Sequence, residues 1–486
     1  MAAQEAYMII DIGTGNVRVA VAAKNGQILS VERDNMPYRK DENYPESIFF
    51  DPQELWAKIT TLAQTALQQV PDVEIKALTA TSQREGIVLL GKEGESLIGL
   101  PNIDHRGREW ENILADKSYV YELTGRYPSS LFSALKLVGT REGSPRTWEQ
   151  VATFLSISDW AQYMLSGTAR YEHSQASETL LYEVAQKRWS PELCFLFDLK
   201  GNILSPLAAA GTILGTILPA RAAQLGISPQ AVVIVGGADT QLAIAGTQAA
   251  LADVVIVSGT TTPIIKLTES YIIDEKERSW TNRHTDENSF VLETNAGVTG
   301  LNYQRLKEIF YPNESYEVIE KELSELSHLQ CVASLGSLVA DEKAPITKGG
   351  FIFPAPVSHL LTRGHFVWAT LWDIACSIKE NYDTLCAIHP HQQDYVWACG
   401  GGFQSPLLRQ FIANLLNKKV YIRDNYKQSS VVGGVLICNA ALGETAQQPV
   451  PVAVVNPQPG PQDSQLYREW KNNRRTFKQI CLEEVA

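Results

Sequence analysis

A glycine-rich turn near the N-terminus contains the first residues whose types could do chemistry. In IIDIGTGNVRVAV (residues 9–21), Asp11 ends an apolar run and a short polar turn follows it. Glycines let backbone N–H groups approach a phosphate closely, and the threonine hydroxyl adds a donor. The Asp11 carboxylate could hold the metal ion that nucleotide phosphates require, and Arg18 could reach a phosphoryl group. A plain β-hairpin explains the turn equally well. The residues of the predicted phosphate site are Asp11, Gly13, Thr14, Gly15, Asn16 and Arg18.

Two further turns built from small residues favour the phosphate interpretation. Gly259, Thr260 and Thr261 follow the apolar run VVIV in the second half of the chain. Three glycines at 400–402 follow another apolar run and could admit a flat adenine and its ribose. No GxxxxGK[ST] sequence occurs, and no GxGxxG opens a helix, so a Walker A loop and a dinucleotide fold are disfavoured. The three turns together predict a nucleotide held across a cleft.

A single aspartate is the candidate catalytic base. In VIVGGADTQLA (residues 233–243), two glycines end an apolar run and Asp239 follows them. A carboxylate at this position could accept the proton of an attacking hydroxyl group. The alternative role for Asp239 is that of a helix N-cap, which is common for aspartate before an apolar helix.

Two charged pairs follow apolar runs and could bind a polyol. Arg84 and Glu85 lie in TSQREGIVLL, and Asp104 and Arg106 lie in NIDHR. Adjacent opposite charges at the end of a strand are often only a solvated rim. Four such groups together could instead hydrogen-bond several hydroxyls, which is how buried polar groups give sugar specificity.

The elements that must position these residues alternate between strands and helices. Valines at 17, 19 and 21 have the period of a strand, Asn25-Gly26 predicts a hairpin turn, and QILSV is a third strand. Residues 52–69 have helical spacing and 75–83 predict another strand, so the fold class is α/β. The strand–Gly-Thr–strand unit recurs at 254–267, which suggests a duplicated fold. We therefore predict two domains, residues 1–248 and 249–486.

Size and composition restrict the class of protein. The chain has 486 residues, a hydrophobic fraction of 44% and a formal net charge of −12. An acidic chain argues against nucleic acid or an anionic membrane as partner, because either requires a basic face. The 7 cysteines form no CxxC pair, so neither a zinc site nor a disulfide framework is expected. No signal peptide or membrane span is evident, and the expected compartment is the cytoplasm.

These motifs, in this order, resemble the FGGY family of carbohydrate kinases, within the actin-like, hexokinase and heat-shock ATPase superfamily. The family's GGxD motif matches Gly236–Asp239, and its second phosphate motif matches 259–261. Its adenosine motif matches Gly400–Gln410, and a late ATALG-like segment matches 429–434. The resemblance covers almost the whole chain.

The resemblance implies a fold, a reaction and roles for residues. The fold would be two actin-like (ribonuclease H-like) domains with an ATP cleft between them. Asp239 would be the general base, and a small sugar, ketose or polyol would be phosphorylated by ATP with Mg²⁺. Homodimers are common among such enzymes, although the sequence does not establish one. By resemblance, Gln241 joins Arg84, Glu85, Asp104, Arg106 and Asp239 at the substrate; Gly401, Gly402 and Ser405 bind ATP; Asp11 and Asp239 hold the metal.

The sequence does not identify the substrate. SQREGIVL and ISDWAQYMLSG (157–167) resemble the autoinducer kinase subgroup, which acts on an open-chain, five-carbon dihydroxy-dione, whereas Arg84-Glu85 resembles glycerol kinases. The chain departs from the family at Gln428, where a glutamate is usual, and over 351–371, where the usual GERTP text is absent.

A function of a different class is an actin-like ATPase that acts as a chaperone or sugar sensor without transferring phosphate to sugar. Such a protein would share the phosphate turns. It would have no use for Arg84-Glu85 and the Asp104/Arg106 cluster, so these residues favour the kinase.

Overall fold

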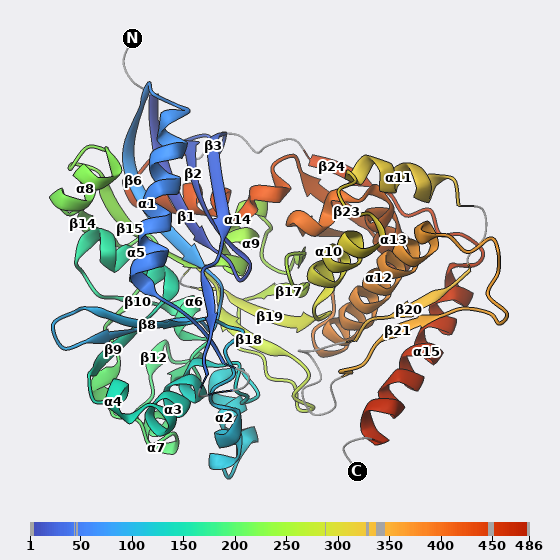
Figure 1. Cartoon of the computed structure of the whole chain (residues 1–486), viewed down its shortest axis with the longest axis horizontal. Coiled ribbons are helices and arrows are strands. Elements are labelled where there is room, and N and C mark those ends of the chain that lie inside the picture. The colour runs from blue at the N-terminus through green and yellow to red at the C-terminus, as the bar shows by residue number, and fades with distance from the viewer. Residues whose placement is uncertain are drawn as a thin grey trace. The chain divides into compact units, whose positions relative to one another are not determined.

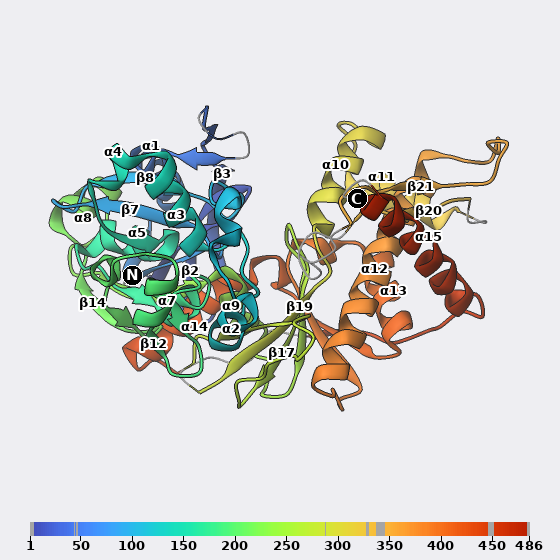
Figure 2. The same cartoon turned by 90° about the horizontal axis from the view of Figure 1, so that it is seen from below.

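The computed structural model describes residues 4–42, 44, 47–286, 288–326, 330–336, 346–445 and 452–483 (Figures 1 and 2). The chain forms two compact units. Unit 1 is Met1–Gln248, Thr268–Val291 and Gln428–Pro449, and unit 2 is Ala249–Leu267, Leu292–Lys427 and Val450–Ala486. The chain first leaves unit 1 after Gln248 but returns to it twice, so these units differ from a single division at 248/249. The domain ranges 1–248 and 249–486 stay a prediction.

In the main sheet of unit 1, the predicted phosphate turn joins the neighbouring strands β1 and β2. The strand order of this sheet is β14-β15-β6-β1-β2-β3. Strands β1 and β2 are antiparallel neighbours, β2 and β3 likewise, and β6 runs parallel to both β1 and β15. The predicted succession of three strands joined by two turns is therefore confirmed. The strands are β1 (Gln4–Ile12), β2 (Asn16–Ala23), β3 (Ile28–Asn35), β6 (Val73–Ser82), β14 (Ile213–Thr216) and β15 (Val232–Ala238).

Helices pack against this sheet. α1 (Pro52–Gln68) packs against β2 and β3, and α5 (Ile157–Ser166) against β6 and β15. α9 (Asp239–Thr247) and α14 (Ser429–Leu442) share a core with Tyr7 and Ile9 of β1. Because side chains alternate across a strand, Asp11 lies on the same face of β1 as Tyr7 and Ile9. The hairpin thus directs Asp11 toward α14.

α9 and α14 approach each other at two glycines. A Cβ on Gly246 would lie 2.1 Å from the Ser429 carbonyl oxygen, and one on Gly433 would lie 2.0 Å from the Leu242 carbonyl oxygen. No side chain fits at such distances, so both positions require glycine. The late segment that resembles the family's ATALG-like stretch is thereby held against the helix that begins at Asp239.

Unit 1 has a second sheet, with strand order β4-β5-β8-β7-β9, and its strand β7 is the next strand after β6 in the chain. The loop between β6 and β7 holds Arg84 and Glu85. The remaining elements of unit 1 are β4 (Tyr38–Lys40), β5 (Ile48–Phe50), β7 (Ile87–Gly91), β8 (Ser96–Leu100), α2 (Lys117–Thr124), α3 (Ser133–Gly143), α4 (Pro145–Trp148), β9 (Val151–Ser156), β10 (Tyr171–Glu172), α6 (His173–Ala176), β11 (Tyr182–Glu183), β12 (Arg188–Trp189), α7 (Pro191–Leu196), β13 (Leu207–Ala208), α8 (Pro219–Leu225) and β18 (Trp280–Arg283).

Unit 2 is built on a sheet that contains the order β17-β16-β22-β23-β24. The helix after the three glycines is α13, with Ser405 as N-cap and Pro406 at its first position. The last helix of the described chain is α15. The elements of unit 2 are β16 (Val254–Val257), β17 (Pro263–Thr268), β19 (Phe290–Asn295), α10 (Thr299–Phe310), α11 (Tyr316–Ser324), β20 (Val332–Ser334), β21 (Gly350–Ile352), α12 (Arg363–Ile388), β22 (Tyr395–Cys399), α13 (Pro406–Leu416), β23 (Lys419–Arg423), β24 (Val452–Val455) and α15 (Asp463–Glu483).

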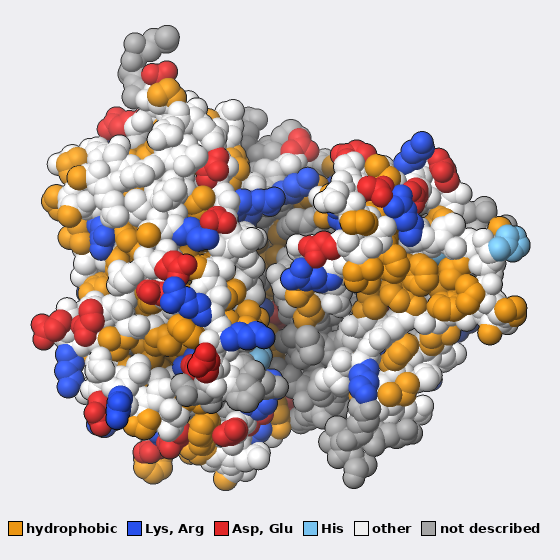
Figure 3. Space-filling model, in the orientation of Figure 1, with side chains coloured by type: hydrophobic (Ala, Val, Ile, Leu, Met, Phe, Trp, Pro, Cys, Tyr) orange, Lys and Arg blue, Asp and Glu red, His pale blue; other side chains and the backbone are white. Residues whose placement is uncertain are grey.

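The surface of each unit carries both signs of charge, and unit 2 also shows a broad hydrophobic area (Figure 3). Exposed apolar side chains of unit 2 include Ile309, Ile352, Phe353 and Val357. Within the described part of the chain, no helix combines the length and the apolar character that a bilayer crossing needs.

Candidate active site

Asp239 lies at the point where β15 ends and α9 begins. Its Oδ1 accepts hydrogen bonds from the backbone N–H (2.6 Å) and the hydroxyl (3.2 Å) of Thr240. Ala238, not Asp239, is the N-cap residue of α9, and it makes no side-chain cap bond. The N-cap alternative for Asp239 is therefore not the arrangement that the structure shows. The carboxylate is partly buried at the edge of the sheet.

Asp11 occupies the equivalent place at the end of β1. Its Oδ2 accepts hydrogen bonds from Arg18 Nε (3.0 Å) and Nη2 (2.7 Å) and from the hydroxyl of Ser430 (2.6 Å). Arg18 also donates from Nη1 to Oε1 of Gln428 at 2.9 Å. The guanidinium of Arg18, which we expected to reach a phosphate, thus pairs with the carboxylate of Asp11. The two residues lie opposite each other in the β1–β2 hairpin. Gln428, where the family usually has glutamate, serves here as an acceptor for Arg18.

The glycine turn between β1 and β2 is closed by one backbone bond, from Gly13 N to Asn16 O at 2.9 Å. The hydroxyl of Thr14 accepts from Nδ2 of Asn102 at 2.9 Å, which ties the turn to the NIDHR segment. A Cβ on Gly15 would meet nothing within 4 Å, so space is open beside this residue. The turn is therefore a hairpin that also leaves room for a ligand.

Asp239 and Asp11 reach the same edge of the sheet because β15 and β1 both flank β6 and run parallel to it. Burial, and then the negative charge of Asp11, raise the pKa of Asp239 to about 6, while the Arg84 cation opposes the rise. A carboxylate with this pKa is largely ionised at neutral pH and can still be protonated, as a general base requires.

Arg84 and Glu85 follow β6, and both are buried. Glu85 has a φ of 62°, a left-handed conformation that is strained for a side chain of this kind and is typical of functional loops. Burial, and then the charge of Glu178, raise the pKa of Glu85 to about 8. Nη1 of Arg84 lies 3.7 Å from Oε1 of Glu178. Glu178 is a residue that the sequence analysis missed, because it is distant along the chain and carries no motif.

The Asp104–Arg106 pair is engaged within the fold. Nε of Arg106 donates to Oδ2 of Asp104 at 2.8 Å, and Oδ1 of Asp104 accepts from the backbone of Ile48 at 3.1 Å. The guanidinium also lies over the ring of Tyr44, with 5.4 Å to the ring centroid. Both side chains are buried. These contacts hold neighbouring segments of the fold together. That Asp104 and Arg106 bind the substrate stays a prediction.

Gln241 is buried on the first turn of α9. Its Nε2 donates to the carbonyl oxygen of Arg283 at 3.3 Å. Its Oε1 has no hydrogen-bond partner among the described residues. A substrate contact for this oxygen stays a prediction.

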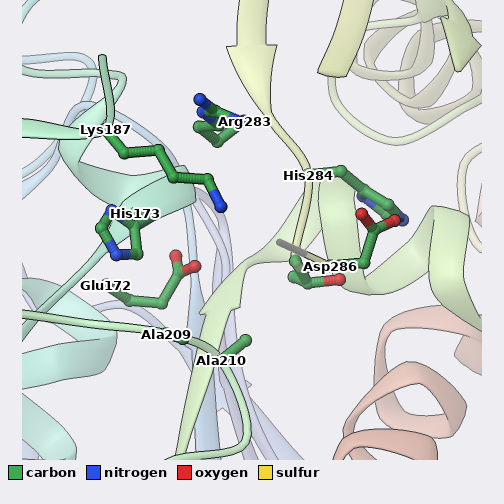
Figure 4. A pocket seen from close by; sticks show the side chains of 9 residues that line it. Glu172, His173, Lys187, Ala209, Ala210, Arg283, His284 and Asp286 are labelled. Atoms are coloured by element: carbon green, nitrogen blue, oxygen red, sulfur yellow. Dashed lines mark ion pairs between the residues drawn. The ribbon is translucent and has the colours of Figure 1, made fainter. Parts of the chain in front are cut away.

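Unit 1 contains a small pocket lined by residues of several segments, among them Glu172, Arg283 and Asp286 (Figure 4). Oε2 of Glu172, one of its lining residues, accepts from the backbone N–H (2.8 Å) and the hydroxyl of Ser174. The Ser174 hydroxyl in turn accepts from the backbone N–H of Ala238 at 3.0 Å. Glu172 therefore supports the residue that precedes Asp239, a role that the sequence did not suggest. Figure 4 shows Lys187, Arg283, His284 and Asp286 around the same pocket.

The two predicted nucleotide turns of unit 2 lie against each other. A Cβ on Gly400 would lie 2.3 Å from the Ser258 carbonyl oxygen, and one on Gly402 would lie 2.0 Å from Oγ of Ser258. Two of the three glycines thus allow close packing against the 258–261 turn. A Cβ on Gly401 would meet nothing within 4 Å, so this glycine borders open space. Oγ of Ser405 accepts from the backbone of Leu408 at 3.4 Å and caps α13.

Gly259, Thr260 and Thr261 are exposed or half-exposed. The backbone N–H of Gly259 donates to the Thr261 carbonyl oxygen at 2.9 Å, which closes the turn. A Cβ on Gly300 would lie 1.9 Å from the Gly259 carbonyl oxygen, so α10 begins directly against this turn. Small residues on both sides leave its exposed edge accessible to a ligand.

The carboxylates suit a divalent cation only in part. No group of three His, Cys, Asp or Glu side chains that could hold a metal occurs among the described residues. Asp11 and Asp239 nevertheless lie close enough for the charge of one to raise the pKa of the other. A cation held jointly with phosphate oxygens would relieve this repulsion, and hard oxygen ligands are those that Mg²⁺ prefers.

Comparisons with known proteins identify the family. Residues 6–246 match the N-terminal domain of the FGGY family of carbohydrate kinases, and residues 339–442 match its C-terminal domain. A protein of Bacillus subtilis (strain 168) named "Putative sugar kinase YoaC" is 51% identical over 479 residues, 98% of each chain. An "Autoinducer-2 kinase" of Salmonella paratyphi A is 25% identical over 457 residues, 90% of this chain and 86% of the relative.

Solved structures show the same fold. A xylulose kinase from Lactobacillus acidophilus has a TM-score of 0.82 at 17% identity and covers 99% of both chains. A Plasmodium falciparum glycerol kinase with ADP has a TM-score of 0.84 at 17% identity and covers 98% of both chains. The predicted α/β fold of two actin-like domains is thereby confirmed. The chain belongs to the FGGY family of carbohydrate kinases and is a phosphotransferase that acts on a sugar hydroxyl.

Proposed function

We propose that this chain transfers the γ-phosphoryl group of ATP to a hydroxyl of a small sugar, ketose or polyol, with Asp239 as the general base. The observation that carries the proposal is the environment of Asp239. Its carboxylate stands at the end of β15, with a pKa raised to about 6 by burial and by Asp11. Arg84 and Glu85, at the end of the neighbouring strand β6, supply donors for a polar substrate.

In the proposed reaction, the chain's own residues orient the acceptor and remove its proton. Oδ2 of Asp239 would accept the proton of the substrate hydroxyl as the hydroxyl oxygen attacks the γ-phosphorus and ADP leaves, while Oδ1 keeps its hydrogen bonds from Thr240. Arg84 would donate to a substrate oxygen. Glu85, neutral at pH 7 because its pKa is about 8, would donate its O–H to a second one.

ATP and Mg²⁺ would occupy the turns described above. The turns at 13–16 and 259–261 offer backbone N–H groups and threonine hydroxyls to phosphates, and Gly401, Gly402 and Ser405 border the proposed adenosine site. Asp11 and Asp239 would hold Mg²⁺. The bound ion would neutralise phosphate charge as the phosphoryl group leaves.

The substrate class is proposed from the relatives' names and the site. The relatives and structural neighbours are named as kinases of autoinducer-2, xylulose and glycerol, and the last two of these compounds carry several hydroxyl groups. For this chain we favour a pentulose or an open-chain dihydroxy-dione. A homodimer is a second proposal, and sedimentation velocity over a concentration series tests it.

The decisive variant is Asp239→Asn. We expect phosphoryl transfer to fall by about 10³-fold or more, because the amide cannot accept the proton. Sugar affinity should change little, since shape and the hydrogen bonds to Thr240 are largely kept. The measurement is a coupled ADP assay over ketoses and polyols, with binding by calorimetry.

Asp116→Asn is the matched control, because Asp116 caps α2 through its carboxylate and lies outside the site. This control should turn over like the parent protein. Asp239→Asn turnover at the parent rate would refute the role of Asp239. ATP turnover that none of the compounds stimulates would favour an actin-like ATPase that senses sugar without phosphorylating it.

A further inference from the structure

A fully buried ion pair lies next to the proposed sugar residues. Nη2 of Arg126, which follows α2, donates to Oε1 of Glu178 at 2.5 Å, and the two side chains are 0% and 1% exposed. Nη1 of Arg84 approaches the same oxygen at 3.7 Å. No motif pointed to either residue, because Arg126 and Glu178 are 52 positions apart in the sequence.

The pair is only half satisfied by the protein. Nε and Nη1 of Arg126 and Oε2 of Glu178 have no hydrogen-bond partner among the described residues. Buried donors and acceptors that lack partners are costly and rare, above all when they belong to charged groups. Two nitrogens of Arg126, which carry three N–H groups, and one carboxylate oxygen of Glu178 are therefore available to a polar ligand.

These unpaired atoms lie close to Arg84, which we proposed as a sugar-binding residue. The Arg126 guanidinium lies over the ring of Trp280, 4.4 Å from its centroid, and Arg84 lies 5.9 Å from the same ring. Arg84 in turn acts on Asp239 by its charge, and Glu178 acts on Glu85. Arg84, Glu178 and Arg126 thus form one charged cluster in unit 1, with the Trp280 ring against its two arginines.

We propose that Arg126 and Glu178 determine substrate specificity by binding an uncharged ligand: Arg126 donates to a carbonyl or hydroxyl oxygen, and Glu178 accepts from a hydroxyl next to it. This inference rests on the proposed function for the location of the site. The pair has no net charge, so it supplies donors and an acceptor without attracting an anion. A ketose fits both groups, whereas a sugar acid would place its carboxylate against Glu178.

A buried ion pair can also be purely structural, and the variants are chosen to separate the two roles. Replacing both partners by apolar residues of similar size often preserves stability, whereas removing one leaves an unpaired charge. The double variant Arg126→Met with Glu178→Leu is therefore expected to fold with a melting temperature near that of the parent. It should nevertheless lose the polar contacts to the ligand.

The experiment measures binding to the full chain without nucleotide, by calorimetry. The probes are ribulose and xylulose, the matching alditols ribitol and xylitol, and the matching acids ribonate and xylonate. We expect the parent to bind a ketose at least about 10-fold more tightly than the matching acid, since sites built from buried polar groups reject ligands that leave those groups unpaired.

Glu178→Gln should reverse part of this preference. It leaves the charges of Arg84 and Arg126 uncompensated, so the ratio of ketose to acid affinity should fall at least about 10-fold. The double variant should lose ketose affinity by about 100-fold or more, because both contacts disappear. Arg474→Met is the matched control: Arg474 is also buried, lies 5.0 Å from the Trp470 centroid and approaches Asp373, but belongs to unit 2. Its sugar affinities should equal those of the parent.

Three results would overturn the inference: a folded double variant that binds ketose like the parent, a Glu178→Gln variant that weakens ketose and acid equally, or a parent that binds none of the probes. Because binding is measured without ATP, the two proposals can fail separately. A parent that binds ketose but does not phosphorylate it refutes the kinase proposal alone. A parent that phosphorylates ketose while the double variant binds it unchanged refutes the specificity proposal alone.

Discussion

At the scale of single residues, two acids of the site have pKa values on opposite sides of neutral pH. Burial and Asp11 raise the pKa of Asp239 to about 6, and burial and Glu178 raise that of Glu85 to about 8. Asp239 is therefore ionised and Glu85 protonated between these values. One can act as an acceptor and the other as a donor at the same pH.

The first prediction is a bell-shaped pH profile of kcat/KM. Activity should rise as pH increases through about 6, where Asp239 loses its proton, and should fall above about 8, where Glu85 loses the O–H that it donates. Steady-state assays from pH 5 to 9.5 measure it. Glu85→Gln keeps an N–H donor at all pH values and should lose the alkaline limb; an unchanged alkaline limb in this variant would show that another group titrates there.

At the scale of elements, the contacts between helices decide where the catalytic carboxylates lie. α14 is the last helix of unit 1, and it meets both α9 and the β1–β2 hairpin. Ser430, in its first turn, donates to Asp11. The spacing between the helices is set by glycines at 246 and 433. A change in this spacing would disturb Asp11 through Ser430.

The second prediction concerns Gly433→Ala. The added Cβ would lie 2.0 Å from the Leu242 carbonyl oxygen, so α14 must move away from α9. We expect a loss of about 1–3 kcal/mol in the free energy of unfolding, as for overpacked cores, and a lower turnover as well. Urea titration measures the first effect. Gly201→Ala, whose Cβ meets nothing within 4 Å, is the control and should be neutral. A stable, fully active Gly433→Ala variant would contradict the requirement for close packing.

The third prediction concerns Asp159, in the first turn of α5. Its Oδ2 accepts from the Ser156 hydroxyl (2.6 Å) and the backbone of Glu172 (3.1 Å), and burial raises its pKa to about 8. The folded protein thus binds a proton that the unfolded chain releases near pH 4.

Relative to Asp159→Asn, the parent should therefore lose stability as pH rises between these values, by about 1.4 kcal/mol per pH unit. Above pH 8 the difference should level off. Denaturant titrations from pH 5 to 9 measure it. A difference between the two proteins that stays constant with pH would show that Asp159 is ionised throughout.

At the scale of the whole molecule, the residues proposed for the sugar all belong to unit 1, whereas those proposed for the nucleotide come from both units. Asp239, Arg84, Glu178 and Arg126 belong to unit 1, and the turns at 259–261 and 400–402 belong to unit 2. Phosphoryl transfer needs both sets of residues. Changes in one set should therefore be separable from changes in the other by binding measurements.

The fourth prediction uses Gly401→Leu. Nothing lies within 4 Å of the added Cβ, so the variant should fold, but its side chain would fill space proposed for the adenosine. We expect the KM for ATP to rise at least about 10-fold, with sugar affinity unchanged. Gly201→Leu, equally open but in unit 1, is the control. Equal effects of the two variants on ATP would place the nucleotide elsewhere.

The sequence by itself determined those features that depend on local patterns. The period of valines at 17, 19 and 21 fixes strand β2, and Ser405-Pro406 fixes the start of α13, because caps and alternation act over a few residues. The same patterns marked Asp11 and Asp239 at strand ends. The order of these motifs was enough to indicate the family.

Only the tertiary structure decided which distant residues meet. Ser430 reaches Asp11 across 419 positions, and Glu178 joins Arg126 and Arg84 without any motif of its own. It also decided that Arg18 pairs with Asp11. Such pairings depend on strand order and helix packing, which bring together side chains that no local pattern links. Burial then changes the chemistry of these groups, because their pKa values depend on neighbours that sequence order does not reveal.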